Sequence, residues 1–375
     1  MQKKKFTVLF VSTSYPADNK DWRGRFTANT VAAISHNDCI RLNIWAPPGD
    51  LPENVKDTSI ATEAEWLKQL MVQGGIAHLL RSRGPFAADT VFKLLLYLKR
   101  LYKREKNIDV AHINWLQNAI PLWHSTTPTV ISVLGSDLGF LKFPGMKFFL
   151  RHVIRKRKCI IAPNADWMVS ELQPVFGDIA EIRSVPFGVD KMWFNIKRKP
   201  INREKNKWLV ITRLTQKKIG TLFEWGKHLF KNSFELHLFG PMQENLQVPN
   251  WIVYHGPVSP DDLHAKWFPT SSGLITLSLH DEGRPQVMLE AMAAGLPVIA
   301  SPLKAHIDII DDKQTGCIVS TPKELEQALI FLSNPITNNN IGENAKRWIV
   351  KNIGTWDDCA TRYINIYQTL MSELI

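Results

Sequence analysis

The hydrophobic pattern along the chain alternates short apolar, β-branched runs with segments of helical periodicity. One such run, "KFTVLFVST", opens the chain and is followed by a loop and by a helical stretch near "TANTVAAIS". Strand, loop and helix in this order are typical of a parallel α/β unit. The order recurs with strands expected in "RLNIWAPP", "IDVAHINW", "PTVISVLGSD" and "CIIAPNADWMVSEL". The first half of the chain is therefore predicted to be a doubly wound α/β domain.

A second strand series follows a polar, basic stretch. The segment "NIKRKPINREKNK" has no hydrophobic periodicity and is predicted to be a linker. Beyond it, strands are expected in "WLVITRL", "FELHLFGP", "WIVYHGP", "GLITLS" and "PVIAS". The pattern predicts two α/β domains in tandem, joined near residue 200.

Composition agrees with a globular chain of this organisation. The 375 residues are 45% hydrophobic and 22% charged, and this length favours two hydrophobic cores. No apolar run reaches the roughly 18 residues that span a bilayer, and the apolar run after the basic start is too short for a signal peptide, so we expect a cytoplasmic protein. The four cysteines lie far apart, which predicts reduced thiols and no metal site.

The formal charge of +11 calls for an anionic partner: nucleic acid, a membrane surface or a phosphorylated substrate. The densest basic segment is "LKFPGMKFFLRHVIRKRKC", residues 141–159, where phenylalanines alternate with cations. This composition is typical of a helix that docks on an anionic membrane, and a core-packed helix with a solvated basic face is the open alternative. Nucleic acid is disfavoured because no recognition motif accompanies the charge. The candidate docking residues are Lys147, Arg151, Arg155, Lys156, Arg157 and Lys158.

Two common phosphate-binding motifs are absent from the sequence. No G-x-G-x-x-G follows the opening strand of either half, and no G-x-x-x-x-G-K-[ST] occurs. Ordinary NAD chemistry and nucleoside triphosphate hydrolysis are therefore disfavoured.

The segment "HDEGRPQVMLEAMAAGLPVIAS", residues 280–301, combines a loop at a strand end with a helix. Ligands of open α/β sheets bind at the carboxyl ends of strands, and the start of such a helix suits a phosphate. Glu290, further into the helix, could accept hydrogen bonds from two neighbouring hydroxyls such as those of a ribose, while Glu282 would face the rest of the ligand. Alternatively, Glu282 complements the helix dipole and Glu290 is a solvated residue.

The stretch "EGRPQVMLEAMAAGLPVIAS" resembles the E-x7-E signature of the fourth family of retaining glycosyltransferases, which have the GT-B fold and use nucleotide-sugars. Further similar segments follow in family order: "DVAHINW", "VLGSDL", "VPFGVDKMWF", "ITRLTQKKIG", "LFGP", "YHGPVS" and "TWDDCATRY". The resemblance implies two Rossmann-like doubly wound domains facing a central cleft. These are an acceptor-binding domain over 1–196 and a nucleotide-sugar-binding domain over 197–355, with a helix in 356–375 packing back on the first.

The resemblance also assigns roles to residues. Glu290 would hold the donor ribose, Glu282 would contact the transferred sugar, and Arg213 with Lys218 would bind the diphosphate. A cation pair after a strand can stabilise a diphosphate leaving group without a metal. Lys217 could replace Lys218, and a solvated basic loop is the alternative. The expected catalytic residues are Glu282, Arg213, Lys218 and Asp137; further donor contacts are expected from Arg284, Pro285, Gln286, Val287, Gly24 and Gly240.

The first half departs from the family pattern at one position. Many relatives carry histidine directly before the glycine of "VLGSDL", where this chain has Leu134. Either Gly135, Ser136 and Asp137 supply the polar contacts to the donor sugar, or the reaction geometry depends more on other residues. His112, Asn114 and Ser136 are the expected acceptor-binding residues. Taken alone, a histidine at a strand end is more often structural.

The expected function is retaining transfer of a sugar from a UDP- or GDP-sugar to a glycan or lipid-linked glycan, in surface polysaccharide or lipopolysaccharide biosynthesis. No cofactor or metal is expected, and the protein would bind the inner face of the cytoplasmic membrane peripherally. Two other classes stay open: a nucleotide-sugar epimerase, and a basic nucleic-acid-binding or scaffold protein.

Overall fold

The computed structural model describes residues 5–18, 21–76, 79, 88–200, 206–231 and 233–372. The chain divides into two compact units: unit 1 comprises Met1–Phe187 and Trp356–Ile375, and unit 2 comprises Gly188–Thr355. The first boundary between the two units thus lies between residues 187 and 188, whereas the sequence predicted it between residues 196 and 197. Residues 1–4, the basic start, and residues 201–205 of the predicted linker lie outside the described residues.

Unit 1 is built on a parallel sheet. Its described part contains seven strands in the order β3-β2-β1-β4-β5-β6-β7. Their bounds are β1 Phe6–Val11, β2 Ile40–Trp45, β3 Val55–Asp57, β4 Val110–Asn114, β5 Thr129–Val133, β6 Cys159–Pro163 and β7 Glu181–Ile182. Strand β1 pairs with β2 on one side and β4 on the other, so the strand order reverses between β1 and β4. Open α/β sheets bind ligands at the carboxyl ends of strands at such a reversal.

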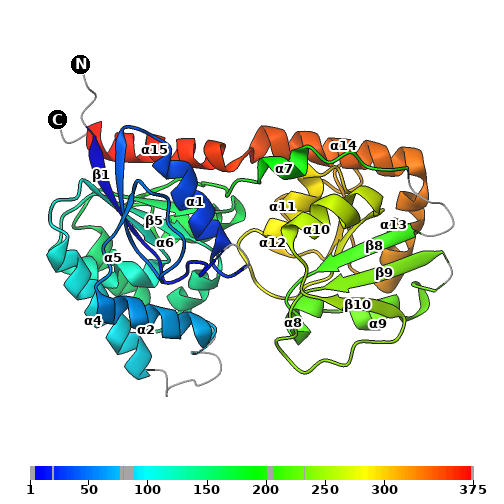
Figure 1. Cartoon of the computed structure of the whole chain (residues 1–375), viewed down its shortest axis with the longest axis horizontal. Helices are drawn as coiled ribbons and strands as arrows, with labels where there is room; N and C mark the ends of the chain where they lie inside the picture. The colour runs from blue at the N-terminus through cyan, green and yellow to red at the C-terminus, as the bar shows by residue number, and fades with distance from the viewer. Residues whose placement is uncertain are drawn as a thin grey trace. The chain divides into compact units, whose positions relative to one another are not determined.

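Helices cover both faces of this sheet (Figure 1). Helices α1 (Arg25–Ser35) and α15 (Trp356–Ser372) pack together on one face. The other face carries α2 (Ala61–Val72), α4 (Ala88–Arg104), η2 (Leu116–His124), η3 (Ser136–Lys142), α5 (Met146–Ile154) and α6 (Trp167–Phe176). In β1, Val8 and Phe10 join the core under α1 and α15, while Leu9 and Val11 join the opposite core. Burial on both faces explains why this strand is a continuous apolar run.

Unit 2 has a second parallel sheet. Its described residues form six strands in the order β10-β9-β8-β11-β12-β13. Their bounds are β8 Asn206–Ile211, β9 Phe234–Phe239, β10 Ile252–Gly256, β11 Gly273–Thr276, β12 Val298–Ala300 and β13 Cys317–Ile318. Strand β8 pairs with both β9 and β11, which places the reversal of strand order between β8 and β11.

The helices of unit 2 also form two layers. One core lies under α7 (Lys191–Phe194), η5 (Leu263–Trp267), α11 (Gln286–Ala293) and α14 (Pro335–Asn352). The other lies under α8 (Gln216–Ile219), α9 (Leu222–Trp225) and α13 (Pro322–Ser333). The remaining short helices are η4 (Gly226–His228), α10 (Pro260–Asp262), η6 (Phe268–Thr270) and α12 (Lys304–Ile307).

The described parts of the predicted linker, residues 195–200 and 206–207, belong to unit 2. Trp193 in α7 is buried in the core of this unit. The guanidinium of Arg198 donates to the carbonyl oxygen of Gly295 and to Oδ1 of Asn338, both at 2.8 Å. Burial lowers the pKa of Arg198 to about 10. A basic residue in a polar stretch is therefore a structural anchor here.

Candidate functional site

The reversal of strand order in unit 2 gathers two segments that lie far apart in sequence. Arg213 follows the carboxyl end of β8, and α8 with Lys218 comes directly after it. The loop 277–285 follows β11, the neighbouring strand. The backbone N–H of Leu279 donates to the carbonyl oxygen of Lys217 at 2.8 Å, which ties this loop to α8. The carboxyl ends of both strands therefore present their side chains at one edge of the sheet.

Lys218 and Glu282 meet at this edge. Nζ of Lys218 donates to Oε2 of Glu282 at 2.5 Å, across 64 residues of sequence. Only 12% and 19% of their side-chain surfaces are exposed. Lys217, the alternative to Lys218, is exposed. The half-buried ammonium of Lys218 could bind a phosphate oxygen, and the carboxylate of Glu282 could accept a hydrogen bond from a hydroxyl.

His306 lies beside this ion pair, and the sequence motifs do not single it out. It is fully buried, and its Nδ1 lies 2.9 Å from the carbonyl oxygen of Ser301, to which it can donate. Burial lowers its pKa, whereas the hydrogen bond to Ser301 and the charge of Glu282 act in the opposite direction. A signal was present in the sequence: His306 follows "PVIAS", the strand next to the one that precedes Glu282.

Glu290 lies within α11, which begins after Pro285, its N-cap residue. The residue as a whole is half-buried, and its carboxyl group is surrounded by protein atoms. Loss of hydration raises its pKa to about 8, and the negative charge of Asp190 adds to the increase. A carboxyl group held partly protonated near neutral pH changes its charge state readily when a ligand approaches.

The predicted donor contacts that flank Glu290 have structural partners. Arg284 and Asp308 form an ion pair whose side chains are 2% and 9% exposed. Nε2 of Gln286 donates to the carbonyl oxygen of Gly188 at 2.8 Å. Val287 packs against the core of unit 2. The buried ion pair gives Arg284 a structural partner, and its expected donor contact stays a prediction.

Two predicted donor-site glycines are required by the backbone. Gly240 has φ of 134°, and a Cβ there would lie 1.7 Å from the carbonyl oxygen of Thr212, the residue before Arg213. Gly24 caps α1 with φ of 72°, and a Cβ would lie 2.6 Å from the amide nitrogen of Tyr15. Both loops follow strand carboxyl ends, β9 and β1 respectively. The close approach explains the glycines without a ligand, and their donor contacts stay a prediction.

His112 belongs to the core of unit 1, which corrects its expected role in acceptor binding. It is fully buried, with Nδ1 hydrogen-bonded to the Tyr367 hydroxyl at 2.5 Å and Nε2 to Ser132 Oγ at 2.8 Å. Ser132 Oγ is in turn 2.8 Å from the Tyr363 hydroxyl. Burial lowers the pKa of His112 to about 3. Both ring nitrogens are therefore engaged in joining β4 and β5 to α15.

Asp137 and Asn114 also organise loops rather than face solvent. The Asp137 carboxylate accepts the backbone N–H groups of Leu134 at 3.1 Å and Gly135 at 3.0 Å, and only 2% of the residue is exposed. Burial raises its pKa to about 6. Asn114 is 3% exposed and donates to Ser12 Oγ at 3.4 Å. The expected catalytic and acceptor roles of these two residues are not supported, while Ser136 remains exposed.

The basic segment 141–159 contains α5 and divides into exposed and engaged cations. Phe143 and Phe148 are 62% and 77% exposed. Arg151, in contrast, donates through both terminal nitrogens to the Asp178 carboxylate at 2.6 and 2.5 Å. Arg157 is buried, which corrects its assignment to a docking surface. The lysines and arginines left exposed on this segment are Lys142, Lys147, Arg155 and Lys156, and Lys158 is half-buried.

Across the described residues, no group of three or more histidine, cysteine, aspartate or glutamate side chains is placed to hold a metal ion. Over the same residues, no helix is both long and apolar enough to cross a membrane.

Comparison with known proteins finds a similarity within the second unit. Residues 205–334 match the family model described as glycosyl transferases group 1. This part of unit 2 is therefore similar to group 1 glycosyl transferases. The amylovoran biosynthesis glycosyltransferase AmsD of Erwinia amylovora is 33% identical over 118 residues, which cover 29% of this chain and 33% of that protein. The curated relatives are matched over less than half of their own lengths, between 22% and 41%.

Solved structures resemble the chain over almost its whole length. Sucrose-phosphate synthase from Thermosynechococcus elongatus aligns with a TM-score of 0.69 at 13% identity, over 98% of this chain and 100% of that chain. Anabaena HepE in complex with UDP and glucose aligns with a TM-score of 0.63 at 12% identity, over 97% and 100%. These similarities confirm the predicted fold, GT-B, with two Rossmann-like α/β domains.

Proposed function

We propose that this protein is a retaining glycosyltransferase that uses a nucleotide-sugar donor. The observation that carries the proposal is the Lys218–Glu282 pair at the reversal of strand order in the part of unit 2 that is similar to group 1 glycosyl transferases. A cation for the diphosphate and a carboxylate for a sugar hydroxyl then stand together where ligands of this fold class bind.

The donor diphosphate would displace Glu282 from Lys218. The two side chains neutralise one another at 2.5 Å. A diphosphate offers Lys218 more negative charge than one carboxylate does, and Arg213 after β8 adds a second cation. As the bond from the anomeric carbon to the phosphate breaks, charge accumulates on the leaving oxygen, and preorganised cations stabilise it. In this mechanism the protein's own cations take the role of a metal.

Retention would follow if the acceptor hydroxyl attacks the face from which the diphosphate leaves and passes its proton to the departing phosphate oxygen. Glu282, released from Lys218, would accept a hydrogen bond from the transferred sugar, and Glu290 would accept hydrogen bonds from the ribose hydroxyls. His306, buried beside the pair, would hold the loops after β11 and β12 in register through Ser301. No side chain then serves as a covalent nucleophile.

The proposals for the donor base and for the acceptor class rest on similarity to relatives. Structures of HepE are described with UDP and with UDP-glucose, which favours a uridine nucleotide. The name of the Erwinia relative places it in amylovoran biosynthesis, which favours a glycan or lipid-linked glycan acceptor in surface polysaccharide or lipopolysaccharide biosynthesis. The exposed Phe143 and Phe148, with the exposed cations of the same segment, suit a peripheral position on the inner face of the cytoplasmic membrane.

A ligand screen followed by a turnover assay tests the proposal. Thermal unfolding would be measured with UDP, GDP, ADP and their sugars, because a ligand that binds only the folded state raises the melting temperature. We expect one nucleotide-sugar to stabilise the protein and an added glycan acceptor to be required for turnover. Turnover without acceptor would indicate an epimerase instead. Absence of any nucleotide effect, with salt-sensitive binding to nucleic acid, would indicate the scaffold alternative.

A further inference from the structure

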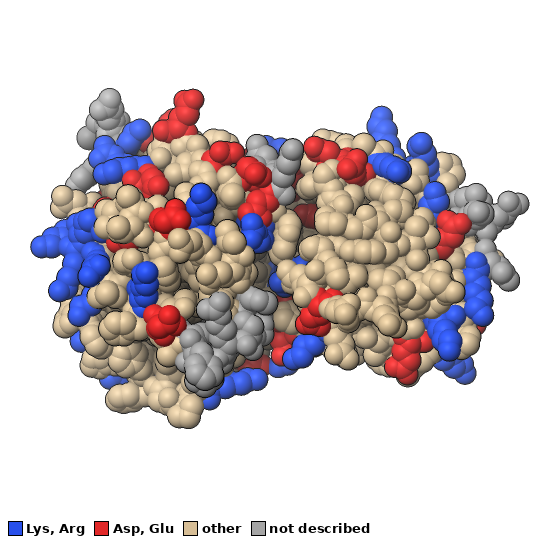
Figure 2. Space-filling view, turned by 60° about the horizontal axis from the view of Figure 1, so that its bottom comes forward, with Lys and Arg blue, Asp and Glu red and all other residues tan. Residues whose placement is uncertain are grey.

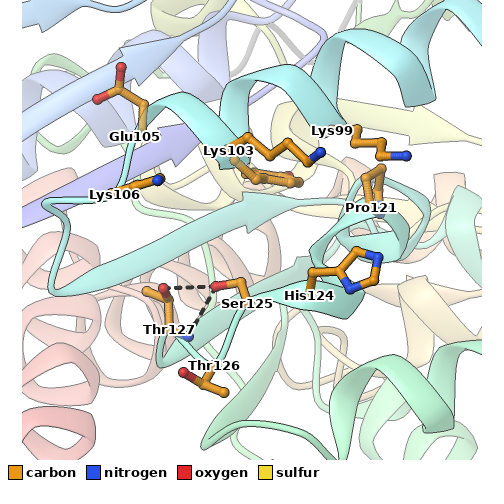
Figure 3. A pocket seen from close by; sticks show the side chains of 10 residues that line it. Lys99, Lys103, Glu105, Lys106, Pro121, His124, Ser125, Thr126 and Thr127 are labelled. Atoms are coloured by element: carbon orange, nitrogen blue, oxygen red, sulfur yellow. Dashed lines mark hydrogen bonds between the residues drawn. The ribbon is translucent and has the colours of Figure 1, made fainter.

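Unit 1 has a pocket at the edge of its sheet opposite to the strand carboxyl ends. The pocket has a volume of about 310 Å³ and is lined by residues 99–106, at the end of α4, and by residues 121–127 (Figure 3). These segments lead into β4 and β5 respectively, so the pocket lies at the amino ends of both strands. Gly24 and Ser136, in contrast, follow strand carboxyl ends. The pocket is therefore separate from the edge at which a Rossmann-like unit binds its usual ligand.

One side of the pocket is formed by lysines without a counter-charge. Lys99 and Lys103 are four residues apart, which places them on one side of α4, and Lys106 follows the end of this helix; all three line the pocket (Figure 3). In the described part of the chain none of the three forms an ion pair. Glu105, the acid in the lining, has Oε1 3.7 Å from Nε of Arg104.

The helix dipole does not account for this arrangement. A cation in the last turn, such as Lys103, is stabilised by the negative end of the helix. Lys99 lies a full turn earlier, and Lys106 lies beyond Arg104, the last residue of α4. Like charges at this spacing repel one another. An anion bound between them would remove that repulsion.

The facing side of the pocket offers hydroxyl donors. Ser125 Oγ donates to Thr127 Oγ1 at 2.9 Å and accepts the backbone N–H of Thr127 at 3.1 Å (Figure 3). Thr127 Oγ1 uses a lone pair for this contact, so its own hydrogen is available to an acceptor in the pocket. The Thr126 side chain beside it is exposed. Hydroxyl donors opposite ammonium groups match the oxygens of a phosphate.

A buried cation, Arg157, adds positive charge near the pocket. Arg157 is 8% exposed and donates through one terminal nitrogen to the carbonyl oxygen of Leu122 at 2.8 Å. Its Nε and other terminal nitrogen are buried without a hydrogen-bond partner among the described residues. Its charge acts on Tyr102, which lines the pocket. A nearby anion would stabilise this desolvated guanidinium.

Lysine and arginine side chains also gather at the end of unit 1 seen at the left of Figure 2. We propose that the pocket at the end of α4 binds a phosphate group, with Lys99, Lys103 and Lys106 supplying the charge and Thr126 and Thr127 donating hydrogen bonds. The ligand class is inorganic phosphate or a phosphate monoester, which a soluble metabolite or a lipid headgroup can provide.

The test uses His124, which lines the pocket, as a local probe. Inorganic phosphate is titrated into the full-length protein while the ring signals of His124 are followed by NMR. We expect a saturable shift in the wild type. The triple variant Lys99→Gln, Lys103→Gln and Lys106→Gln should bind roughly tenfold more weakly or worse. A wild type without a saturable shift of His124, or a triple variant that titrates like the wild type, would overturn the proposal.

A matched control separates the pocket from net charge. Lys5, Lys56 and Lys68 are exposed lysines of the same unit that lie outside the pocket lining. Their joint replacement by glutamine removes the same charge and should leave the phosphate titration unchanged. Equal weakening in both triple variants would assign the effect to the general field of the protein and contradict a built site. The milder variant Thr126→Val with Thr127→Val keeps all charges and should still weaken binding severalfold.

Vesicles then distinguish the two sources of phosphate. Sedimentation is measured with phosphatidylcholine vesicles with and without phosphatidic acid. If the pocket takes a lipid headgroup, phosphatidic acid will recruit the wild type, free phosphate will compete, and the pocket triple variant will lose more binding than the control. If the pocket takes a soluble phosphate, the His124 titration will succeed while both triple variants sediment alike. Either result retains the phosphate site and assigns its source.

Discussion

Lys218 and Glu282 are joined by a hydrogen-bonded ion pair at 2.5 Å, although 64 residues separate them in sequence. Each side chain neutralises the other in this pair, so a bound diphosphate would have to displace Glu282 from Lys218. This arrangement makes the two residues separable by experiment. Removing the carboxylate frees a cation for phosphate, and removing the cation leaves a carboxylate that repels it.

Glu282→Ala should therefore bind nucleoside diphosphate at least as tightly as the wild type but transfer sugar slowly. Joint replacement of Arg213 and Lys218 by alanine should instead lose about tenfold or more in affinity, because two charges that face the diphosphate are gone. Calorimetric titration with UDP measures the first property and a coupled transfer assay the second. Near-native affinity in the double variant would remove both cations from the donor site.

The raised pKa of Glu290 predicts that donor affinity depends on pH. Its pKa is raised to about 8 in the unliganded protein, so at pH 7 the carboxyl group is mostly protonated. Ribose hydroxyls that donate to the carboxylate favour the ionised form, so binding should release up to about one proton at pH 7. Affinity should rise as pH increases toward 8 and then level off. Calorimetry in buffers with different ionisation enthalpies counts the protons.

The control for this prediction is Glu290→Gln, which cannot ionise. It should bind donor more weakly at pH 8 and show the same heat in every buffer after correction for ligand protonation. Glu290→Ala should weaken binding further. Buffer-independent heats in the wild type would show that the carboxyl group does not meet the nucleotide.

The His112 network predicts a stability effect and a pH window. The Tyr367→Phe substitution removes the hydroxyl that pairs with Nδ1 and should destabilise unit 1 by about 1–3 kcal/mol, because a buried polar nitrogen loses its partner. The pKa of His112 is near 3 in the folded protein and 6.5 in the reference state, so unfolding takes up a proton below pH 6.5. Stability should therefore be intact above pH 6.5 and fall as the pH decreases toward 3.

Denaturant unfolding between pH 8 and pH 4 measures both effects. The turnover number per folded molecule should be unchanged in Tyr367→Phe if His112 has only a structural role. A large loss of turnover with normal stability would restore His112 to the acceptor site.

The exposed part of the basic segment predicts membrane association. Arg155→Glu with Lys156→Glu should reduce sedimentation with anionic vesicles severalfold, since each cation near the surface contributes about 1 kcal/mol. Activity on a soluble acceptor should be spared. The same reversals at Lys323 and Lys351, exposed residues of unit 2, serve as the control. Wild-type protein that ignores anionic vesicles at low salt would leave the segment a solvated surface.

Strands with continuous apolar runs were predictable from sequence, whereas short edge strands were not. The predicted runs correspond to β1, β2, β4, β5 and β6 in unit 1 and to β8 through β12 in unit 2. Strands β3, β7 and β13 span two or three residues each at sheet edges. An edge strand has one partner and needs no long apolar run, so its pattern does not stand out.

Site residues whose position is set by the order of the strands were predictable from sequence. Residues whose position is set by tertiary packing were not. Arg213, Lys218 and Glu282 follow neighbouring strands, and sequence order alone predicts their common edge. The burial of His112 depends on Tyr367, 255 residues away, which no local pattern reveals. The burial of Arg157 was hidden in the same way, because Arg157 belongs to the same run of basic residues as the exposed Arg155 and Lys156.

The position of α15 at the end of the chain affects the order in which the two units can fold during synthesis. Tyr363 and Tyr367 complete the core of unit 1 beside His112, yet they leave the ribosome after all of unit 2. The nascent chain can close the contiguous unit 2 first, while one face of the earlier-synthesised sheet of unit 1 is covered by α1 but not yet by α15. Until the last helix arrives, that apolar face is open to chaperones and to aggregation. A stop codon before residue 356 should thus be most damaging to the part of the protein translated first.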